Sequence, residues 1–511
     1  MLTKVYGSAI FGVSARTITI EVNVSTGVGY HLVGLPDNAI KESNFRISTA
    51  LMNTGYKVPG KKVTINLAPA DLHKEGSAYD LPIAMGILAA SGQIESEDIS
   101  KYMIMGELAL DGMIRPIKGV LPIAIQARDE GFKGFILPKQ NAKEAAVVTD
   151  LEVIGVENIA EVIRFFDQNE AIPPTKIDIQ KEFYEQLNAF ALDFADVKGQ
   201  ENVKRALEIA AAGGHNIILI GPPGSGKTML AKRIPSILPP LSLEEALETT
   251  KIHSVAGKLG DTSSLMTVRP YCAPHHTVSD AGLVGGGSYP QPGEISLAHN
   301  GVLFLDELPE FKRTVLEVMR QPLEDREITI SRARFTVTYP SSFMLVASMN
   351  PSPSGYFPDD PNNTSSLQEM QRYMNKISGP LMDRIDLHIE VSPVPFDDLS
   401  QGRTGEKSVE IRRRVELARN LQTQRYDGIP NIHYNAQMGP KQLDVYCQLD
   451  ESGRTLIKNA MEKLNLSARA YDRILRVSRT IADLEGASAL SAVHIAEAIQ
   501  YRSLDREGWG I

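Results

Sequence analysis

The sequence predicts an α/β protein that ends in a helical part, and three observations support this fold class. Strand patterns alternate with helix patterns over residues 1–168 and again over residues 194–393. Beyond residue 394 only helix patterns follow. In the middle region, the glycine-rich segment GPPGSGKT stands between a strand pattern and a helix pattern. The length of 511 residues agrees with about three domains.

Residues 1–168 are expected to form an α/β domain with its own core. Asp37 suits the start of a helix over 37–54, and Gly55 suits its end. Residues 80–90 are apolar nearly all round, which predicts a buried helix. A third helix is predicted over 116–129, and strands over 4–13, 16–24, 30–35, 62–67, 134–137 and 151–155.

Two breaks divide the rest of the chain. Residues 169–193 begin polar and contain Pro173-Pro174, which predicts a linker. The second domain is expected over 194–393, and a proline-containing break precedes the helical domain, 394–511. Helices are predicted there over 408–425, 440–447, 451–463, 467–485 and 491–501.

Composition limits the possible partners and compartment. The net charge is −9 and the isoelectric point about 5.7, so DNA contact has to come from local basic loops. The two cysteines lie far apart, which agrees with a reducing compartment. No run of 18 apolar residues and no signal-peptide pattern occurs. We therefore expect a cytoplasmic protein that does not enter a membrane.

The glycine-rich segment matches G-x-x-x-x-G-K-[ST], the phosphate-binding loop of P-loop NTPases. Its glycines let backbone N–H groups converge on phosphate, and the following helix adds its positive N-terminal end. The lysine is expected to contact the outer phosphates of ATP, and the threonine hydroxyl to bind Mg²⁺. The segment consists of Gly221, Pro222, Pro223, Gly224, Ser225, Gly226, Lys227 and Thr228.

Two later strand patterns end in polar residues. The strand over 301–305 ends at Asp306 and Glu307, where Asp306 is expected near Mg²⁺ and Glu307 as the base for the attacking water. The strand over 343–348 is followed by Asn350, which could hold this water or read the γ-phosphate. An asparagine that only starts a turn before Pro351 is the alternative.

The order of phosphate loop, Asp-Glu strand and Asn-ending strand resembles the core of AAA+ ATPases. The segments APHHT (273–277), LVGGG (283–287) and PGEISLAHN (292–300) extend the similarity to magnesium-chelatase-like AAA+ ATPases of the ComM/YifB type. The resemblance covers essentially the whole chain. It implies a homo-oligomeric ring, expected to be a hexamer, with ATP sites between subunits.

The same resemblance implies roles for two arginines. The segment LMDRID (381–386) resembles one that carries an arginine finger, so Arg384 is expected to reach the γ-phosphate of a neighbouring subunit. An ion pair with Asp383 or Asp386 is the alternative. Arg469 is expected to be the second phosphate-reading arginine, with Arg473 as the alternative.

Residues 327–338 contain two strand patterns around a short basic turn, which predicts a hairpin. Relatives use a hairpin at this place to line the pore of the ring. Arg332 and Arg334 are the candidate contacts to DNA phosphates, and solvated arginines are the alternative. Cys272, His275 and His276 lack the second ligand pair that a structural zinc site needs, so a structured loop near the pore or the ATP site is favoured.

The N-terminal domain resembles the ribosomal-S5-like fold shared with Lon-type proteases. Ala78 stands at the position of the nucleophilic serine, with Ser77 one residue away. Leu121 stands at the position of the lysine base, and Lys118 is the nearby amine. A Ser–Lys dyad requires hydrogen-bond geometry, so an inactive protease-like domain is expected.

The leading hypothesis is an ATP-hydrolysing ring motor that acts on branched or single-stranded DNA. In the ComM/YifB family this implies branch migration, or helicase activity, in homologous recombination or natural transformation. One alternative is the motor subunit of a magnesium chelatase, against which the N-terminal domain argues. The other is an ATP-dependent protease or a regulatory remnant of one, against which the missing dyad argues.

Overall fold

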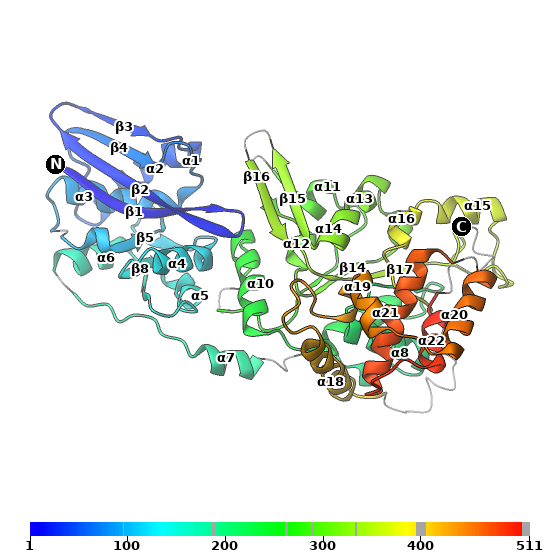
Figure 1. The fold of residues 1–511 in the computed structure, drawn as a ribbon. Helices are drawn as coiled ribbons and strands as arrows, with labels where there is room; N and C mark the ends of the chain where they lie inside the picture. The colour runs from blue at the N-terminus through cyan, green and yellow to red at the C-terminus, as the bar shows by residue number, and fades with distance from the viewer. Residues whose placement is uncertain are drawn as a thin grey trace. The chain divides into compact units, whose positions relative to one another are not determined.

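The computed structural model describes the chain except for residues 96, 169, 187–189, 261–263, 288–289, 333–334, 395–404, 465 and 503–511. The chain divides into two compact units, each described by itself (Figure 1). The first unit comprises Met1–Gln186, Leu243–Thr267 and Pro290–Pro292. The second comprises Leu187–Ser242, Val268–Tyr289 and Gly293–Ile511.

The first unit is built on a seven-stranded mixed sheet. Its strands are β1 (Leu2–Phe11), β2 (Ser14–Ser25), β3 (Gly29–Val33), β4 (Lys62–Ala68), β5 (Tyr102–Ile104), β8 (Gly134–Pro138) and β9 (Glu152–Val156). They lie in the order β3-β4-β2-β1-β5-β8-β9. The pairs β1–β2 and β2–β4 are antiparallel, and the other neighbours are parallel. A short antiparallel pair joins β6 (Glu107–Leu108) to β7 (Ile114–Arg115).

Helices complete this unit. They are α1 (Asn38–Lys41), α2 (Ser43–Asn53), α3 (Asp80–Ala90), α4 (Val120–Asp129), α5 (Ala142–Ala145), α6 (Ile159–Asp167), α7 (Ile179–Gln186) and α10 (Leu243–Ala256). Every residue of α3 is buried, as its apolar sequence predicted. The single helix predicted over 37–54 is wrong, because Glu42 separates α1 from α2, although Asp37 does cap α1 by accepting a hydrogen bond from Ile40. The helix predicted from residue 116 begins only at Val120, because Gly119 before it has a left-handed backbone.

Helix α10 belongs to the first unit although it lies more than 100 residues beyond α4 in the sequence. The Ser254 carbonyl accepts a 3.0 Å hydrogen bond from the Gly119 N–H at the start of α4. The Ser254 hydroxyl donates a hydrogen bond to the buried carboxyl group of Glu144 on α5. The segment that follows the phosphate loop in the sequence therefore contributes to the core of the first unit.

The second unit contains a five-stranded, all-parallel sheet. Its strands are β10 (Ile217–Ile220), β11 (Tyr271–Cys272), β14 (Val302–Leu305), β17 (Met344–Met349) and β18 (Leu387–Glu390). They lie in the order β11-β14-β17-β10-β18. All residues of β10, β14 and β17 are buried, because a parallel sheet is covered on both faces. Strand β17 separates β10 from β14, so the carboxyl ends of three strands meet at one edge.

Short helices and one hairpin surround this sheet. They are α8 (Glu201–Gly213), α9 (Lys227–Ala231), α11 (Asp280–Val284), α12 (Glu294–Leu297), α13 (Arg313–Val318), α14 (Arg320–Asp325), β15 (Glu327–Arg332), β16 (Phe335–Pro340), α15 (Leu367–Met374) and α16 (Gly379–Met382). The hairpin predicted over 327–338 is confirmed by the antiparallel pairing of β15 with β16.

Five helices form the C-terminal part of the second unit, and each predicted boundary is correct to within one residue. They are α18 (Ser408–Arg425), α19 (Pro440–Tyr446), α20 (Glu451–Leu464), α21 (Ala468–Leu484) and α22 (Ala492–Gln500). The agreement is best explained at α21, which has strong 3.6-residue periodicity and the capping residue Ser467, whose hydroxyl accepts a hydrogen bond from the Ala470 N–H.

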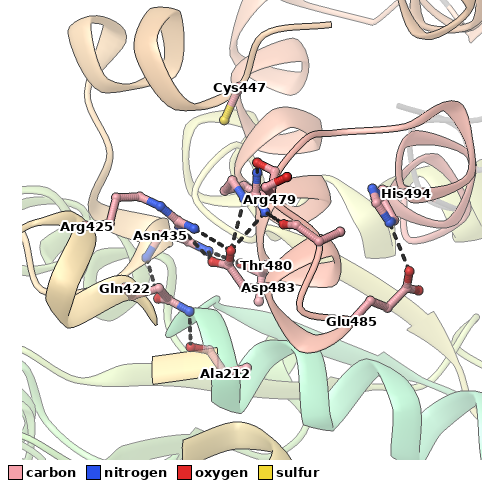
Figure 2. Close-up of polar contacts among 12 residues, drawn as sticks. Ala212, Gln422, Arg425, Asn435, Cys447, Arg479, Thr480, Asp483, Glu485 and His494 are labelled. Atoms are coloured by element: carbon pink, nitrogen blue, oxygen red, sulfur yellow. Dashed lines mark hydrogen bonds and ion pairs between the residues drawn. The ribbon is translucent and has the colours of Figure 1, made fainter. Parts of the chain in front are cut away.

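A largely buried polar network joins α18 to α21 and to α8 (Figure 2). The Asp483 carboxylate accepts hydrogen bonds from Arg425 (2.7 Å) and from Arg479 (3.1 Å). Gln422 donates a 3.1 Å hydrogen bond to the carbonyl of Ala212. Because Ala212 lies near the end of the helix that leads into β10, the helical part is anchored beside the strand that carries the phosphate loop.

Candidate active site

The phosphate loop connects the carboxyl end of β10 to α9, and its backbone explains the glycines. A side chain at Gly221 would place Cβ 2.2 Å from the carbonyl oxygen of Val391. Gly224 and Gly226 have φ angles of 79° and 93°, which other residues rarely adopt. The loop therefore takes this path only with glycine at these positions.

Lys227 lies inside the loop, with 9% of its surface exposed. Its Nζ atom donates hydrogen bonds to the carbonyls of Gly221 (2.7 Å) and Pro222 (3.0 Å) and to Oδ1 of Asn350 (3.3 Å). Burial lowers the pKa of Lys227, and the charges of Asp306 and Glu307 oppose this shift. The structure thus brings the lysine and the asparagine that follows β17 to one place.

The residues proposed for Mg²⁺ also meet. The Thr228 hydroxyl donates a 2.8 Å hydrogen bond to Oδ2 of Asp306, which follows β14. Ser348, on β17, donates a hydrogen bond to the other carboxylate oxygen. A hydroxyl and a carboxylate facing each other are the oxygen ligands that Mg²⁺ takes, with phosphates and waters completing its shell. The donor set fits the ion.

Glu307 adopts a left-handed backbone conformation with φ 55°. Its N–H donates a 3.3 Å hydrogen bond to the Ser348 hydroxyl. The side chain is half exposed, and its Oε2 atom lies 3.6 Å from Nδ1 of His276. Sequence analysis expected the loop with His276 near the pore or the ATP site, but it did not indicate the contact of His276 with Glu307 or those of Ser348, because these contacts arise from neighbouring strands.

The two proposed phosphate-reading arginines lie elsewhere. A cavity of about 380 Å³ is lined by Arg384, Arg469, Arg473 and Arg476, and we call it the arginine pocket. Asn216, which precedes β10, also lines it. The phosphate loop follows the other end of β10, and a four-residue strand spans about 13 Å. The arginine pocket therefore lies at the amino end of β10, and the phosphate loop lies at its carboxyl end.

Three of these arginines, Arg384, Arg469 and Arg473, have acidic partners within the chain. Arg384 pairs with Glu324, so the alternative of an ion pair with Asp383 or Asp386 is wrong. Asp383 instead contacts Arg469 at 3.0 Å, and Asp386 contacts Arg473 at 2.5 Å. Glu324 is 60 residues from Arg384 in sequence, which is why spacing did not reveal it.

Asp386 ties the arginine pocket to β10. Burial raises the pKa of its carboxyl group, but the charge of Arg473, with His215, outweighs burial and the pKa is lowered. The Asn216 N–H donates a 3.0 Å hydrogen bond to this carboxylate. The Asn216 side chain donates a 2.9 Å hydrogen bond to the carbonyl of Arg384. The position of Arg384 is thereby fixed relative to the strand that leads into the phosphate loop.

Of the two candidate DNA contacts, Arg332 is exposed at the end of β15. Arg334 lies outside the described residues.

In the first unit, the Ser77 hydroxyl donates a hydrogen bond to Glu107, whereas the Lys118 side chain lies beside Gly257. The described contacts of these two residues therefore do not join them in a Ser–Lys pair.

These features define a P-loop AAA+ ATPase core: a parallel sheet, a phosphate loop, two acids after β14 and a set of C-terminal helices. An α/β unit of the Lon-protease-like type precedes this core in the sequence. Three family models match the chain: magnesium chelatase subunit ChlI over residues 193–399, subunit ChlI of Mg-chelatase over 20–141, and the ChlI C-terminal part over 405–502. The magnesium-chelatase 38 kDa subunit of Rhodobacter capsulatus is 23% identical over 334 residues, 59% of this chain and 84% of the subunit.

Curated relatives match the chain over nearly its whole length. Competence protein ComM of Haemophilus influenzae is 45% identical over 507 residues, covering 99% of this chain and 98% of ComM. YifB of Escherichia coli is 43% identical over 508 residues, with the same coverage. Lon protease 2 of Bacillus subtilis is 33% identical over 157 residues, 28% of this chain and 27% of the protease. The chain belongs to the magnesium-chelatase-like AAA+ family of the ComM/YifB type.

Membership in this family implies an ATPase that uses a nucleotide and Mg²⁺. The described part of the chain has no helix long and apolar enough to cross a membrane.

Proposed function

We propose that the protein hydrolyses ATP at the edge of the sheet where β10, β14 and β17 end. The observation that carries this is the 2.8 Å contact between Thr228 and Asp306, beside the buried Lys227. Converging loop N–H groups and Lys227 would hold the phosphates. Thr228 and Asp306 would hold Mg²⁺, which supplies positive charge to the phosphate oxygens when it is bound.

In this reaction, Glu307 accepts a proton from water as the water oxygen forms a bond to the γ-phosphorus. The bond from the γ-phosphorus to the bridging oxygen breaks, and its electron pair leaves with ADP. Asn350 would orient the water or a γ-phosphate oxygen, because its amide oxygen lies 3.3 Å from Lys227. The side-chain exposure of Glu307 leaves it accessible to water.

We infer that the site is completed by a neighbouring subunit in a ring, expected to be a hexamer. The arginine pocket lies at the other end of β10 from the phosphate loop, which supports a role of its arginines at another subunit's ATP. Arg384 would break its ion pair with Glu324 and bind the γ-phosphate instead, where it would stabilise the negative charge. Arg469, 67% exposed, is freer to read phosphate than Arg473, which is buried against Asp386.

The proposed substrate of the motor is branched or single-stranded DNA, and the expected activity is branch migration. Similarity to a competence protein over 99% of the chain supports this. Arg332, and Arg334 beyond the described residues, would contact backbone phosphates from the β15–β16 hairpin, repeated around the ring. A chelatase motor subunit is the second candidate, supported by the family descriptions.

A strand-exchange experiment tests this function. A synthetic four-way DNA junction with mobile arms is incubated with protein, ATP and Mg²⁺, and duplex products are separated by electrophoresis. We expect the conversion of the junction to require ATP and to be lost in Glu307→Gln. This variant should still bind the junction. A protein that hydrolyses ATP but never converts any junction would contradict the DNA activity and favour the chelatase candidate.

A further inference from the structure

The candidate base Glu307 has one side-chain partner, His276, among the contacts that the described residues make. The distance from Nδ1 of His276 to Oε2 of Glu307 is 3.6 Å. The backbone of Glu307 is fixed by its hydrogen bond to Ser348, but its long side chain is 55% exposed. Without a partner, such a side chain would sample several rotamers.

The ring of His276 packs against two other rings. The ring of His275 packs against it with a centroid distance of 4.1 Å and an interplanar angle of 34°. The ring of Phe311, which is buried, approaches edge-on at 6.4 Å. His275 in turn contacts the Thr277 hydroxyl through Nδ1 at 2.9 Å. An imidazole packed in this way can serve as a fixed support for a mobile carboxylate.

The chain topology explains how the two residues meet. His276 follows β11 by four residues, and Glu307 follows β14 by two. These strands are parallel neighbours, so the segments after them emerge at the same sheet edge. The contact is therefore a consequence of the sheet order and joins the APHHT segment to the hydrolytic site.

We propose that His276 is a positioning residue that holds one carboxylate oxygen of Glu307, so that the other oxygen faces the attacking water. This inference rests on the proposed ATP hydrolysis. In this structure Nδ1 faces Oε2 at 3.6 Å, slightly longer than a hydrogen bond. A small movement of the exposed Glu307 side chain would let Nδ1–H donate to Oε2 and leave Oε1 free to accept the proton of water. The described contacts of His276 are with Glu307, His275 and Phe311 and not with the phosphate loop. Its replacement should therefore affect turnover and leave ATP binding unchanged.

Two variants of similar size separate the N–H donor of His276 from the packing of its ring. Asparagine places an N–H donor near the position of Nδ1, whereas leucine has a similar size and no donor. We expect His276→Leu to lower kcat about tenfold with an unchanged KM for ATP. His276→Asn should retain most of the wild-type kcat. In a Glu307→Gln background, measured in single turnovers, His276→Leu should cause no further decrease, because the group that it orients is gone.

The outcomes are distinguishable. Wild-type turnover by His276→Leu, equal decreases in the leucine and asparagine variants, or an added decrease in the Glu307→Gln background would each overturn the inference. Each of these results leaves ATP hydrolysis by the wild-type protein intact. A wild-type protein that hydrolyses no ATP would instead overturn the proposed function and this inference with it.

Discussion

The hydroxyl of Thr228 donates a 2.8 Å hydrogen bond to the carboxylate of Asp306, a residue 78 positions further along the chain. This bond joins the start of α9 to the end of β14 across the intervening strand β17. The Thr228 hydroxyl oxygen and the Asp306 carboxylate oxygen are therefore already positioned before any ion binds. Binding of Mg²⁺ then costs less conformational entropy, because its ligands do not have to be ordered.

Thr228→Ala should raise the Mg²⁺ concentration needed for half-maximal ATP hydrolysis and lower the maximal rate about tenfold or more, because a metal ligand is removed. Thr228→Ser keeps the hydroxyl and should remain close to wild type. A titration of turnover against Mg²⁺ at saturating ATP measures both quantities. Identical titrations for the alanine and serine variants would argue against a Mg²⁺ role for this hydroxyl.

Mixing two inactive variants tests whether Arg384 serves a neighbouring subunit. Lys227→Ala lacks a working phosphate loop but keeps its arginine, and Arg384→Ala has the reverse defect. Each alone should lose roughly 10³-fold or more of ATP turnover, as expected for a trans arginine. Mixed before assembly, they should regain part of the wild-type rate, because some interfaces combine an intact loop with an intact arginine.

Both variants should retain the oligomeric state of the wild type in sedimentation experiments, which serves as the control. If the mixture is no more active than the separate variants, although mixed oligomers form, Arg384 does not act between subunits.

Arg332→Ala should weaken DNA binding on every sequence alike and flatten its salt dependence, because phosphate contacts carry no base information. The slope of log affinity against log salt should fall by roughly one for each phosphate that the variant no longer neutralises. Fluorescence anisotropy of labelled DNA measures this slope. As a control, Arg128→Ala removes the same charge from the surface of the first unit and should leave the slope unchanged. Equal slopes for all three proteins would exclude Arg332 as a DNA contact.

Glu144→Gln tests the docking of α10 in the first unit through pH. Burial raises the pKa of the Glu144 carboxyl group, and hydrogen bonds from Ser254 and Leu121 only partly offset this. The folded pKa therefore lies above the unfolded one, so the contribution of this group is complete below the unfolded pKa and is lost as pH rises through the folded pKa. Glutamine can accept the same hydrogen bonds without ionising.

Stability of the wild type relative to Glu144→Gln should consequently fall as pH rises from about 4 to neutral. Thermal unfolding midpoints across this range measure the difference, with the exposed Glu97→Gln as the control. Parallel pH curves for wild type and Glu144→Gln would show that Glu144 is not a buried ionisable group in the folded protein.

Local patterns predicted much of this fold. The phosphate loop, the Asp-Glu strand and the five C-terminal helices follow from short-range signals such as glycines, apolar runs and the cap at Ser467. Errors at the local level arose where one helical pattern was broken by a turn, at Glu42, and where Gly119 delayed the start of α4.

Relations between distant segments could not be predicted. The sequence did not indicate that β17 lies between β10 and β14, that α10 packs in the first unit, or that Glu324 pairs with Arg384. These depend on strand pairing and side-chain contacts over long sequence separations, for which a single sequence carries no periodic signal. The contact of His276 with Glu307 belongs to the same class.

The most direct test of the central claim is the rate of phosphate release from ATP by the purified protein, with and without branched DNA at low salt. We expect hydrolysis that DNA stimulates and that Glu307→Gln reduces about 10²-fold or more, while the variant still binds DNA. Absence of hydrolysis, or hydrolysis that DNA leaves unchanged together with no DNA binding, would contradict a DNA-directed ATPase.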